Sequence, residues 1–397
     1  MIRYQLPVRS PLSLDAIWNG VRAMTNTKRG RDAAAGVSAA LEAHLGQTES
    51  LFVDSGTSAL GISLRALDAS TRRPVAIPAF ACYDVATAVN AAGAPFILYD
   101  VDPITLSPDP HSLRSALALG ADRVVVVHLF GVPADLRAVE ALSREYDALV
   151  IEDAAQGAGA SFNHQSVGSR SPLTVLSFGR GKGLTGGNGG ALLGHGETAR
   201  RLIERSRSEL GRATGSSRDL VALLAQWFLS RPVVYGLPAS LPFLRLGETI
   251  HHPTHRPSGI SDLALGVLER TLTLSAAELA IRRKNAARLL TALERTGFVN
   301  IVPASGGVPG YLRLPVLAPG PMLGVVDSVA ARRLGIMRSY PRSLADLPGF
   351  GERRVNASER FPGAVCLATE LLTFPVHGAM STRDLDAIER WIDAVDT

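Results

Sequence analysis

Cysteine and long apolar runs are what this chain of 397 residues most clearly lacks. Its two cysteines, Cys82 and Cys366, are too few for a disulfide framework or a four-cysteine zinc site, so we expect a reducing compartment. The longest helix-like apolar run, 220–229, is about half of the ~20 residues that cross a bilayer. The first residues lack the apolar core of a signal peptide. We therefore expect a cytoplasmic protein without a membrane span.

The chain also has little net charge of either sign. The 41 basic residues exceed the 36 acidic ones by only 5, and no run of five like charges occurs. This distribution does not indicate a nucleic-acid partner, although it suits a small anionic ligand. Apolar residues make up 46% of the chain and charged residues 19%, which excludes a disordered or collagen-like chain, and the length favours two domains.

Lysine is the rarest of the charged residue types. Of the 41 basic residues only Lys28, Lys182 and Lys284 are lysines. Because arginine stays protonated in proteins, a lysine kept in such a chain can indicate a place where an amine must lose its proton. Lys28 and Lys284 lie in charged stretches that we expect to be solvated. Lys182 follows an apolar strand and stands among glycines, which makes it the candidate for chemistry.

Short apolar runs bounded by turn residues alternate with stretches of helical period through the first half of the chain. Strand, helix and strand in repetition predict a mostly parallel sheet with helices on its faces. We expect a helix from 56 onward and further helices at 84–93 and 134–147. The expected strands are 51–55, 75–80, 95–102, 123–131, 148–155, 174–179 and 189–194.

The second half of the chain predicts a different arrangement. Long helices over 262–297 are expected to bridge two domains, and a smaller α+β unit follows. Its expected elements are strands at 311–317 and 371–376 and a closing helix at 383–395. We predict a large domain over 1–265, with an apolar insertion at about 207–250, and a bridging helix with a small C-terminal domain over 266–397.

Polar residues follow several of the predicted strands, at the carboxyl ends where open parallel sheets collect their ligands. Gly56, Thr57 and Ser58 stand where a strand turns into a helix and could offer amides, hydroxyls and the positive helix end to a phosphate, although an ordinary helix cap is the commoner explanation. Asp153 ends a very apolar strand and needs a partner if buried: a protonated ring nitrogen, or backbone amides of the next turn. Gln156 could direct its amide at the same ligand.

Lys182 lies in a glycine-rich stretch, SFGRGKGLTGGNGG, which allows close backbone approach. A Walker motif fails because its first glycine and its hydroxyl residue are missing. A dinucleotide pattern G-x-G-x-x-G does match from Gly181 to Gly186, but a strand-like run follows it instead of the required helix. The remaining interpretation is a Schiff base between Lys182 and pyridoxal phosphate (PLP), with Asp153 keeping the ring nitrogen protonated.

The motifs in this order resemble the DegT/DnrJ/EryC1/StrS aminotransferases, which use PLP and mostly act on nucleotide-linked keto-sugars. The resemblance covers most of the chain, through DSGTSAL, VAIPAF, VVVVHLFGVPADL, VIEDAAQGAGASF, SFGRGKGLTGGNGGALLG and FPGAVCLATELLTFPVHGAMSTRDLDAIERWI. It implies an α/β chain of the PLP-dependent transferase fold type I, similar to aspartate aminotransferase. Such a chain has a large domain with a mostly parallel central sheet and a smaller C-terminal α+β domain.

The same resemblance implies roles for single residues. Lys182 would bind the cofactor and move the proton, and Asp153 would be the partner of the pyridinium nitrogen. Relatives place a flat residue over the ring shortly after VAIPAF; we favour Tyr83 over Cys82 there, because a ring stacks better than a thiol. Gln156 would lie beside the ring hydroxyl. The residues implied to hold the phosphate are Gly56, Thr57, Ser58 and Ser177.

The chain departs from the family pattern in three places. Asn188 stands where relatives have an acidic residue, and Arg180-Gly181 replaces a usual Pro-Thr. The third departure is a loop whose asparagine, in relatives, reaches the partner subunit's cofactor. It reads THRPSG here, at 254–259, without the asparagine. The identity of the substrate is therefore left open.

The insertion near this loop carries an apolar helix around Trp227 and Phe228. We expect this helix to be buried in a dimer or against the large domain. A more specific but less expected alternative is that it docks to a membrane surface or to a lipid-linked substrate. A metal site is suggested by His251, His252 and His255, but loop histidines without a nearby cysteine are usually solvated. We therefore expect no metal.

Together these features predict a homodimeric PLP-dependent aminotransferase. It would move an amino group from L-glutamate to a keto-sugar, expected to be nucleotide-linked, in polysaccharide or secondary-metabolite biosynthesis. A lysine at 182 favours transamination, because relatives that dehydrate sugars carry histidine there. The alternative, motivated by the altered loop, is a PLP-binding regulator or catalytically impaired paralogue that acts as a partner protein. A nicotinamide oxidoreductase rests only on the glycine pattern.

Overall fold

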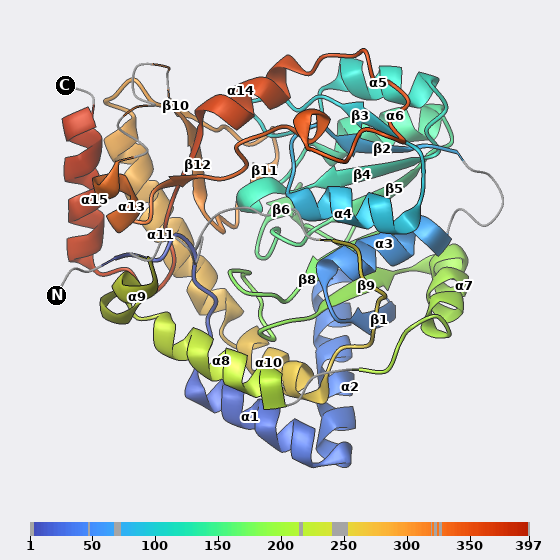
Figure 1. Cartoon of the computed structure of the whole chain (residues 1–397), viewed down its shortest axis with the longest axis horizontal. Helices are drawn as coiled ribbons and strands as arrows, with labels where there is room; N and C mark the ends of the chain where they lie inside the picture. The colour runs from blue at the N-terminus through green and yellow to red at the C-terminus, as the bar shows by residue number, and fades with distance from the viewer. Residues whose placement is uncertain are drawn as a thin grey trace.

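A seven-stranded sheet forms the centre of the molecule (Figure 1), in the order β1-β9-β8-β5-β4-β2-β3. The structure, a computed structural model, describes residues 4–395 except 47, 67–72, 214–216, 240–252, 319, 321–323 and 325–327. The strands from β8 to β3 are parallel, whereas β9 runs in the opposite direction and pairs antiparallel with β8 on one side and with β1 on the other. The mostly parallel sheet is thus confirmed. Its strands are β1 (Glu49–Val53), β2 (Val75–Pro78), β3 (Phe96–Tyr99), β4 (Arg123–Val127), β5 (Leu149–Asp153), β8 (Leu173–Ser177) and β9 (Gly190–Gly194).

Helices cover both faces of the large sheet because its central strands are apolar on both sides. In β4, Val125 and Val127 share a buried cluster with side chains of α3 (Gly56–Ala66) and α4 (Tyr83–Ala92). Val124 and Val126 share another with α5 (Pro110–Ala118) and α6 (Leu136–Glu145). Successive residues of a strand point to opposite faces, so a continuous run of valine serves both helix layers.

Three helices pack against one another beside β8 and β9: α1 (Leu14–Thr25), α2 (Thr27–Leu45) and α10 (Asp262–Leu272). Helices α1 and α10 cross at Gly20 and Gly266, where a Cβ on Gly266 would lie 2.8 Å from the Cα of Gly20. The sequence analysis did not predict α1 and α2, although α2 buries Val37, Leu41 and Leu45 at four-residue spacing. Helix α7 (Gly196–Arg207) lies against β1 and β9.

A second sheet of four antiparallel strands forms the core of the small C-terminal unit, in the order β10-β12-β14-β13. Helices α11 (Ser275–Leu293) and α15 (Thr382–Val395) pack on it. This arrangement confirms the smaller α+β unit. The remaining elements of the small unit are β10 (Val299–Asn300), β12 (Leu314–Leu317), α13 (Val329–Arg333), β13 (Met337–Arg338), α14 (Pro362–Glu370) and β14 (Leu371–Phe374). A separate three-stranded sheet consists of β6 (Ser161–Phe162), β7 (Gln165–Ser166) and β11 (Gly307–Val308).

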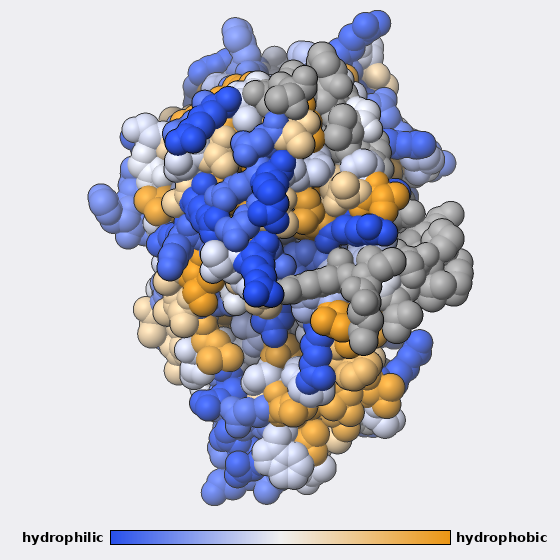
Figure 2. Space-filling view, turned by 90° about the vertical axis from the view of Figure 1, so that its left-hand side faces the viewer, coloured by the Kyte–Doolittle hydropathy of each residue, from blue (hydrophilic) through white to orange (hydrophobic). Residues whose placement is uncertain are grey.

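The predicted insertion contains α8 (Ser217–Leu229) and α9 (Pro232–Ala239). Leu223 is buried and lies against Gly187 of the large unit, but Phe228 is 50% exposed. Figure 2 shows apolar side chains gathered at the lower end of the molecule, where α1 and α8 lie. Only the inner side of α8 therefore has the burial expected from the sequence. No helix in the described part of the chain is long and apolar enough to cross a membrane.

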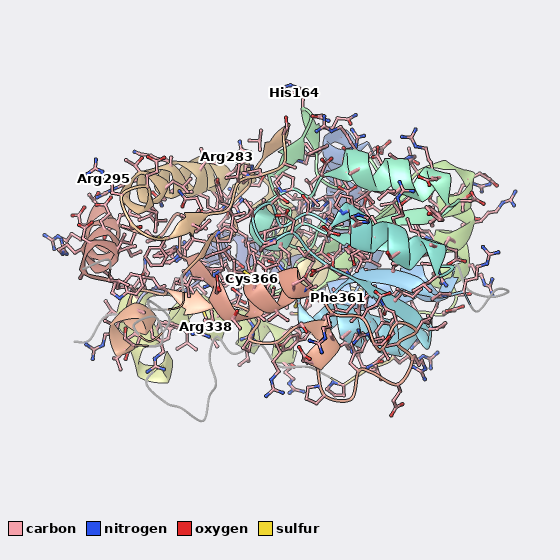
Figure 3. The ribbon with its side chains drawn as sticks, turned by 90° about the horizontal axis from the view of Figure 1, so that it is seen from above. His164, Arg283, Arg295, Arg338, Phe361 and Cys366 are labelled. Carbon is pink, nitrogen blue, oxygen red and sulfur yellow. The ribbon has the colours of Figure 1, made fainter. Side chains whose placement is uncertain are left out.

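The large sheet and the small unit are joined by several contacts between segments that lie far apart in the sequence. The segment before α14 returns to the edge of the large sheet, where Phe350 stacks on Phe96 with ring centroids 4.3 Å apart. Asp100, after β3, accepts the N–H groups of Gly363 and Ala364 at 2.8 Å each. Figure 3 shows Phe361 and Cys366 along this connection between the small sheet and the large one. The chain also begins beside the small unit, since the N–H of Gln5 donates to the carbonyl of Arg333.

Candidate active site

A cavity lies at the carboxyl ends of β4, β5 and β8, opposite the first turns of α3 and α4. We call it the strand-end cavity. It includes every residue predicted from the sequence to bind the cofactor except Ser58 and Tyr83. Its lining consists of Gly56, Thr57, Leu60, Cys82, Asp84, Val85, Val127, Asp153, Ala155, Gln156, Ser177 and Lys182.

The first turn of α3 forms one end of the strand-end cavity. A Cβ on Gly56 would lie 2.8 Å from the Cβ of Ser177, so the helix can start this close to β8 because residue 56 is glycine. The first N–H groups of a helix have no partners within the helix and carry a partial positive charge. Together with the hydroxyls of Thr57 and Ser177, they can bind a phosphate group.

Ser58 lies outside this lining and belongs to a neighbouring network. Its N–H donates to the Oγ of Ser55 at 3.1 Å, and its own Oγ lies 3.0 Å from that oxygen. On the other side the Oγ of Ser58 is 3.3 Å from the Nε2 of His255, which is also 3.3 Å from the carboxylate of Asp54. The Oγ of Ser55 therefore caps the start of α3, and the Oγ of Ser58 belongs to the same network. The role of Ser58 at a phosphate stays a prediction.

Asp153 ends β5 and is 7% exposed. Its Oδ1 accepts the N–H of Ala155 at 3.0 Å, and no cationic side chain within the described ranges forms an ion pair with it. Burial raises the pKa of this carboxyl above its ordinary value, although the Ala155 N–H and the charge of Lys182 act in the opposite direction. A positively charged group in the cavity would compensate this burial.

Glu152 and His128 support the end of β5 from the other face of the sheet. Glu152 is fully buried, and its Oε1 lies 3.0 Å from the Nε2 of His128. The Nδ1 of His128 accepts the N–H of Ala134, so Nε2 carries the proton and donates it to Glu152. Glu152 also accepts the N–H groups of Gly168 and Ser171 at 2.6 and 3.3 Å. Burial raises the pKa of Glu152, but these bonds outweigh burial and leave its pKa below the ordinary value.

The sequence analysis missed this pair, although each member stands in or directly after an apolar strand. Val127 of β4 pairs in register with Asp153 of β5. The histidine after β4 and the glutamate before Asp153 therefore come together through the alignment of two parallel strands. Only the strand order, which one sequence does not provide, makes this contact visible.

Gln156 is held by two hydrogen bonds of opposite polarity. Its Oε1 accepts the N–H of Phe130 at 3.1 Å, and its Nε2 donates to the hydroxyl of Tyr340 at 3.0 Å. Phe130 has a positive φ of 56° and stacks on Tyr340 with ring centroids 5.7 Å apart. Tyr340 comes from the small unit and has no motif around it, which explains why the sequence analysis did not find it.

Cys82 lines the strand-end cavity and Tyr83 does not, so this position gives no support to the preference for Tyr83 over the cofactor ring, which stays a prediction. Tyr83 begins α4 and is 4% exposed, and its hydroxyl accepts the N–H of Arg342 at 3.1 Å. The start of the helix turns the tyrosine toward the small unit and leaves the preceding cysteine on the cavity. Burial, the largest influence, raises the pKa of the Cys82 thiol to about 12, so the sulfur stays protonated at neutral pH.

Lys182 lies in a loop that its glycines and one threonine shape. Gly181 has a φ of 73°, and its N–H donates to the Oγ of Ser10. Thr185 donates to the carbonyl of Phe178 at 3.1 Å and so closes the loop. Within the described ranges, the amine of Lys182 has no hydrogen bond or ion pair, although it is close enough to influence the pKa values of Cys82 and Asp153. The amine is therefore available to a ligand.

Lys182 and Gln156 also line a second cavity, which we call the interdomain cavity. Residues of the small unit form one of its walls, and the loop of Lys182 forms another. The lysine therefore stands between the two cavities. The full lining of the interdomain cavity is Val8, Phe130, Gln156, Arg180, Gly181, Lys182, Leu312, Arg313, Ser339 and Tyr340.

The departures from the family pattern lie around these cavities. The Nδ2 of Asn188 donates to Asp219 of α8 at 3.0 Å, which ties the glycine-rich loop to the insertion. In the THRPSG loop, the N–H and Oγ of Ser258 both donate to Asp54 at 3.0 Å. His251 and His252 lie outside the described residues. Within the described ranges, no three histidine, cysteine, aspartate or glutamate side chains form a group that could hold a metal ion.

Comparisons with known proteins find relatives among aminotransferases. The model of the DegT/DnrJ/EryC1/StrS aminotransferase family matches residues 24–219. The chain is 29% identical over 245 residues to the L-glutamine:2-deoxy-scyllo-inosose aminotransferase of Streptomyces lividus, covering 62% of this chain and 53% of that protein. It is 36% identical over 152 residues to the UDP-N-acetyl-3-dehydro-alpha-D-glucosamine 3-aminotransferase of Acidithiobacillus ferrooxidans, covering 38% of this chain and 40% of that protein.

The fold is also that of solved aminotransferases. The sugar aminotransferase CalS13 of Micromonospora echinospora superposes with a TM-score of 0.76 at 20% identity, over 99% of this chain and 100% of that chain. The matches to the two curated relatives span about half or less of their lengths. The family match includes every strand-end residue from Gly56 to Lys182. The fold is therefore the PLP-dependent transferase fold type I expected from the sequence.

Proposed function

We propose that this chain, which belongs to the DegT/DnrJ/EryC1/StrS aminotransferase family, moves an amino group from L-glutamate to a ketone on a sugar or cyclitol ring. One observation carries the proposal. The amine of Lys182, which has no hydrogen-bond partner among the described residues, lines the strand-end cavity together with the buried carboxyl of Asp153 and the first turn of α3. A lysine amine, an acid for a ring nitrogen and a phosphate site are the three groups that a PLP-dependent transfer needs.

The residues of the strand-end cavity fit PLP, on which aminotransferases of this family depend. Asp153 is buried without a cationic partner among the described side chains, as expected for an acid that meets a protonated ring nitrogen. Thr57 and Ser177 stand with the start of α3 at the phosphate end. When bound there, PLP supplies an aldehyde that condenses with an amine and a ring that takes up electrons.

Each cavity residue has a task in this proposal. Lys182 would hold the cofactor through its amine, and the same Nζ could take up and release a proton during the transfer. Asp153 holds the proton on the ring nitrogen, and the Glu152–His128 pair fixes the strand ends beneath it. Gln156 is oriented by Phe130 and Tyr340 so that its amide faces both cavities.

The finer parts of the proposal concern the acceptor and the assembly. The two curated relatives act, by their names, on an inosose and on a UDP-linked dehydro-sugar, both ketones on hydroxylated rings. We infer a nucleotide-linked keto-sugar as the acceptor, in polysaccharide or secondary-metabolite biosynthesis, and a homodimer as the assembly. The predicted division at residues 265 and 266 and the cytoplasmic location stay predictions.

The visible spectrum of the purified protein tests the proposal. We expect a yellow band that L-glutamate, or the L-glutamine named for the S. lividus relative, bleaches. Lys182→Ala should lower the rate of this bleaching at least ~10³-fold, because the variant lacks both the attachment point and the proton carrier. Lys284→Ala, at an exposed position of α11, is the matched control and should behave like the wild type.

Two results would count against transamination. A protein that takes up no PLP would contradict the whole proposal. A band that no amino donor changes would instead favour the alternative, a PLP-binding regulator or catalytically impaired paralogue. The altered THRPSG loop is the sequence feature that suggests this alternative.

A further inference from the structure

Helices α1, α8 and α9 present large apolar side chains to solvent. On α8 these side chains recur at intervals of three and four residues, at Val221, Leu224 and Phe228, and Val221 is 66% exposed. Helix α8 contacts both α1 and α9, and Figure 2 shows apolar side chains gathered where α1 and α8 lie. We call this the helical apolar surface. Its members are Leu14, Trp18, Val221, Leu224, Phe228, Leu229 and Val233.

The core of the protein does not use these outward side chains. Helix α8 packs its inner side through Leu223, which shares a buried cluster with Ile17 of α1 and Val267 of α10. The outer side, from Val221 to Leu229, stays exposed. Single apolar side chains are common on protein surfaces, but a group of them on adjacent helices indicates a contact with another body.

The charges beside the helical apolar surface are positive. Three arginines on these helices or directly after α8 are exposed and form no ion pair within the described ranges: Arg22, Arg218 and Arg231. The acidic residues of α1 and α8 are already engaged. Asp15 pairs with Arg270, and Asp219 accepts a hydrogen bond from Asn188. The body that covers this surface therefore meets apolar groups together with uncompensated positive charge.

Arg231 shows how charge and apolar area are combined. Its guanidinium carbon lies 4.1 Å from the ring centroid of Trp227 and 5.8 Å from that of Phe228. This cation–π contact keeps a positive charge at the edge of the apolar side chains. Tryptophan, phenylalanine and leucine beside arginine are typical of helices that lie in the headgroup region of a bilayer, where anionic lipids attract the arginines.

A second copy of this chain is the competing occupant. In a twofold contact each surface meets the same surface of the other copy. The arginines of one copy would then approach those of the other, and like charges oppose such a contact. An anionic bilayer takes up the apolar side chains and also supplies the negative charge, so the charges favour lipid.

We propose that the helical apolar surface docks on an anionic lipid bilayer. The helices would lie in the headgroup region, since no helix in the described part of the chain is long and apolar enough to cross a membrane. This inference goes beyond the proposed function and does not depend on it, because docking requires no reaction at Lys182.

Helix α9 links this surface to the interdomain cavity. The N–H of Tyr4, near the start of the chain, donates to the carbonyl of Pro232 at 3.2 Å. Tyr235 is close enough to Arg313 to influence its pKa, and Arg313 lines the interdomain cavity. A chain docked through α8 and α9 therefore holds that cavity near the lipid headgroups.

Flotation of the purified holo protein with vesicles tests the proposal. Wild type should float with vesicles of phosphatidylcholine and phosphatidylglycerol in equal parts, and much less with phosphatidylcholine alone. Val221→Asp should weaken binding to the anionic vesicles at least about tenfold, because it removes an apolar side chain and adds a charge of the wrong sign. Val355→Asp, at a valine that is 50% exposed outside these helices, is the matched control and should bind within about twofold of the wild type.

Arg231→Gln separates the two contributions, because it removes one positive charge and keeps the apolar side chains. Its binding to the anionic vesicles should be about fivefold weaker than that of the wild type, and its binding to phosphatidylcholine alone should not change. The melting temperature and the visible band report whether each variant is folded and loaded.

Tryptophan fluorescence reports which part of the protein meets the lipid. The chain has three tryptophans: Trp18, which is 62% exposed, Trp227 under Arg231, and Trp391, which is 8% exposed in α15. Lipids with brominated chains quench the rings that they contact. They should quench the emission of the wild type, and they should quench that of Trp18→Phe by a smaller fraction.

A wild type that ignores the anionic vesicles would overturn the proposal, as would equal binding by Val221→Asp and Val355→Asp. Equal binding of the wild type to both kinds of vesicle would also overturn it, because the charges select the occupant. A dimer that Val221→Asp converts to a monomer in light scattering, without vesicle binding by the wild type, would assign the surface to a second copy. Vesicle binding by a protein whose visible band no donor bleaches would support this inference and count against the proposed function alone.

Discussion

The strand-end cavity and the interdomain cavity share Lys182 and Gln156 but are built in different ways. The first is assembled from turns that directly follow β5, β8 and the strand before α3, so the order of a parallel sheet brings its residues together. The second needs Val8 near the start of the chain, and Arg313 and Tyr340 from the small unit. On the proposed function, the chemistry would take place at the large sheet, whereas recognition of the substrate would depend on where the small unit lies.

The largest expected effect tests the chemical part of this comparison. Asp153→Asn keeps the shape of the side chain but cannot hold a proton on a ring nitrogen, so the donor half-reaction should slow about 10²- to 10³-fold. Asp84→Asn removes a carboxylate from the same cavity wall and serves as the control, with a much smaller loss. Stopped-flow absorbance measures both. Equal losses in the two variants would show that total charge matters there rather than a specific partner.

A smaller effect concerns stability rather than rate. Glu152→Gln should lower the free energy of unfolding by about 3 kcal/mol at pH 7, because it places an amide among the N–H donors of His128, Gly168 and Ser171. Urea unfolding measures the loss. Glu197→Gln, at an exposed glutamate of α7, is the matched control and should change little.

The same glutamate predicts a pH dependence. The folded-state pKa of Glu152 lies below its ordinary value of 4.5, so the stabilisation is complete above pH 4.5 and is lost as the pH falls through the lowered pKa. Wild type should therefore lose stability below pH 4.5 faster than Glu152→Gln. Parallel curves for the two proteins would show that the carboxylate of Glu152 contributes nothing to acid sensitivity.

The sequence predicted many of the residues that line the strand-end cavity, but few of those that line the interdomain cavity. Gly56, Asp153 and Lys182 could be found because each stands at the junction of an apolar strand with a turn, where position along the chain indicates position in space. The sheet and the small α+β unit could be predicted from hydrophobic period alone. Helices α1 and α2 were not predicted, although Val37, Leu41 and Leu45 of α2 are buried at a helical spacing that the sequence itself contains.

The points that the sequence left open or did not reveal also have physical causes. The choice between Cys82 and Tyr83 depends on where α4 begins, and one residue of difference turns the side chain from the cavity to the small unit. Tyr340 lies 184 residues after Gln156, the side chain it binds, and no local pattern records that contact. Helix α8 looked like a buried helix, but its neighbours in this chain cover only the side of Leu223.

The smallest expected effect tests the recognition part of the comparison. Tyr340→Phe removes the hydroxyl that accepts from Nε2 of Gln156 and leaves the ring on Phe130 in place. One lost hydrogen bond of about 1 kcal/mol should slow the donor half-reaction about fivefold while the affinity for PLP stays the same. Tyr83→Phe, whose hydroxyl binds the backbone of Arg342 outside both linings, is the control and should change neither value.

If Tyr340→Phe instead weakened PLP binding as strongly as it slowed the reaction, Tyr340 would belong functionally to the strand-end cavity. The two cavities would then act as a single site joined through Gln156. A selective loss in the donor step would instead show that the small unit acts on the substrate and leaves the cofactor to the sheet. Equilibrium dialysis of PLP, measured beside the stopped-flow rates, distinguishes these two results.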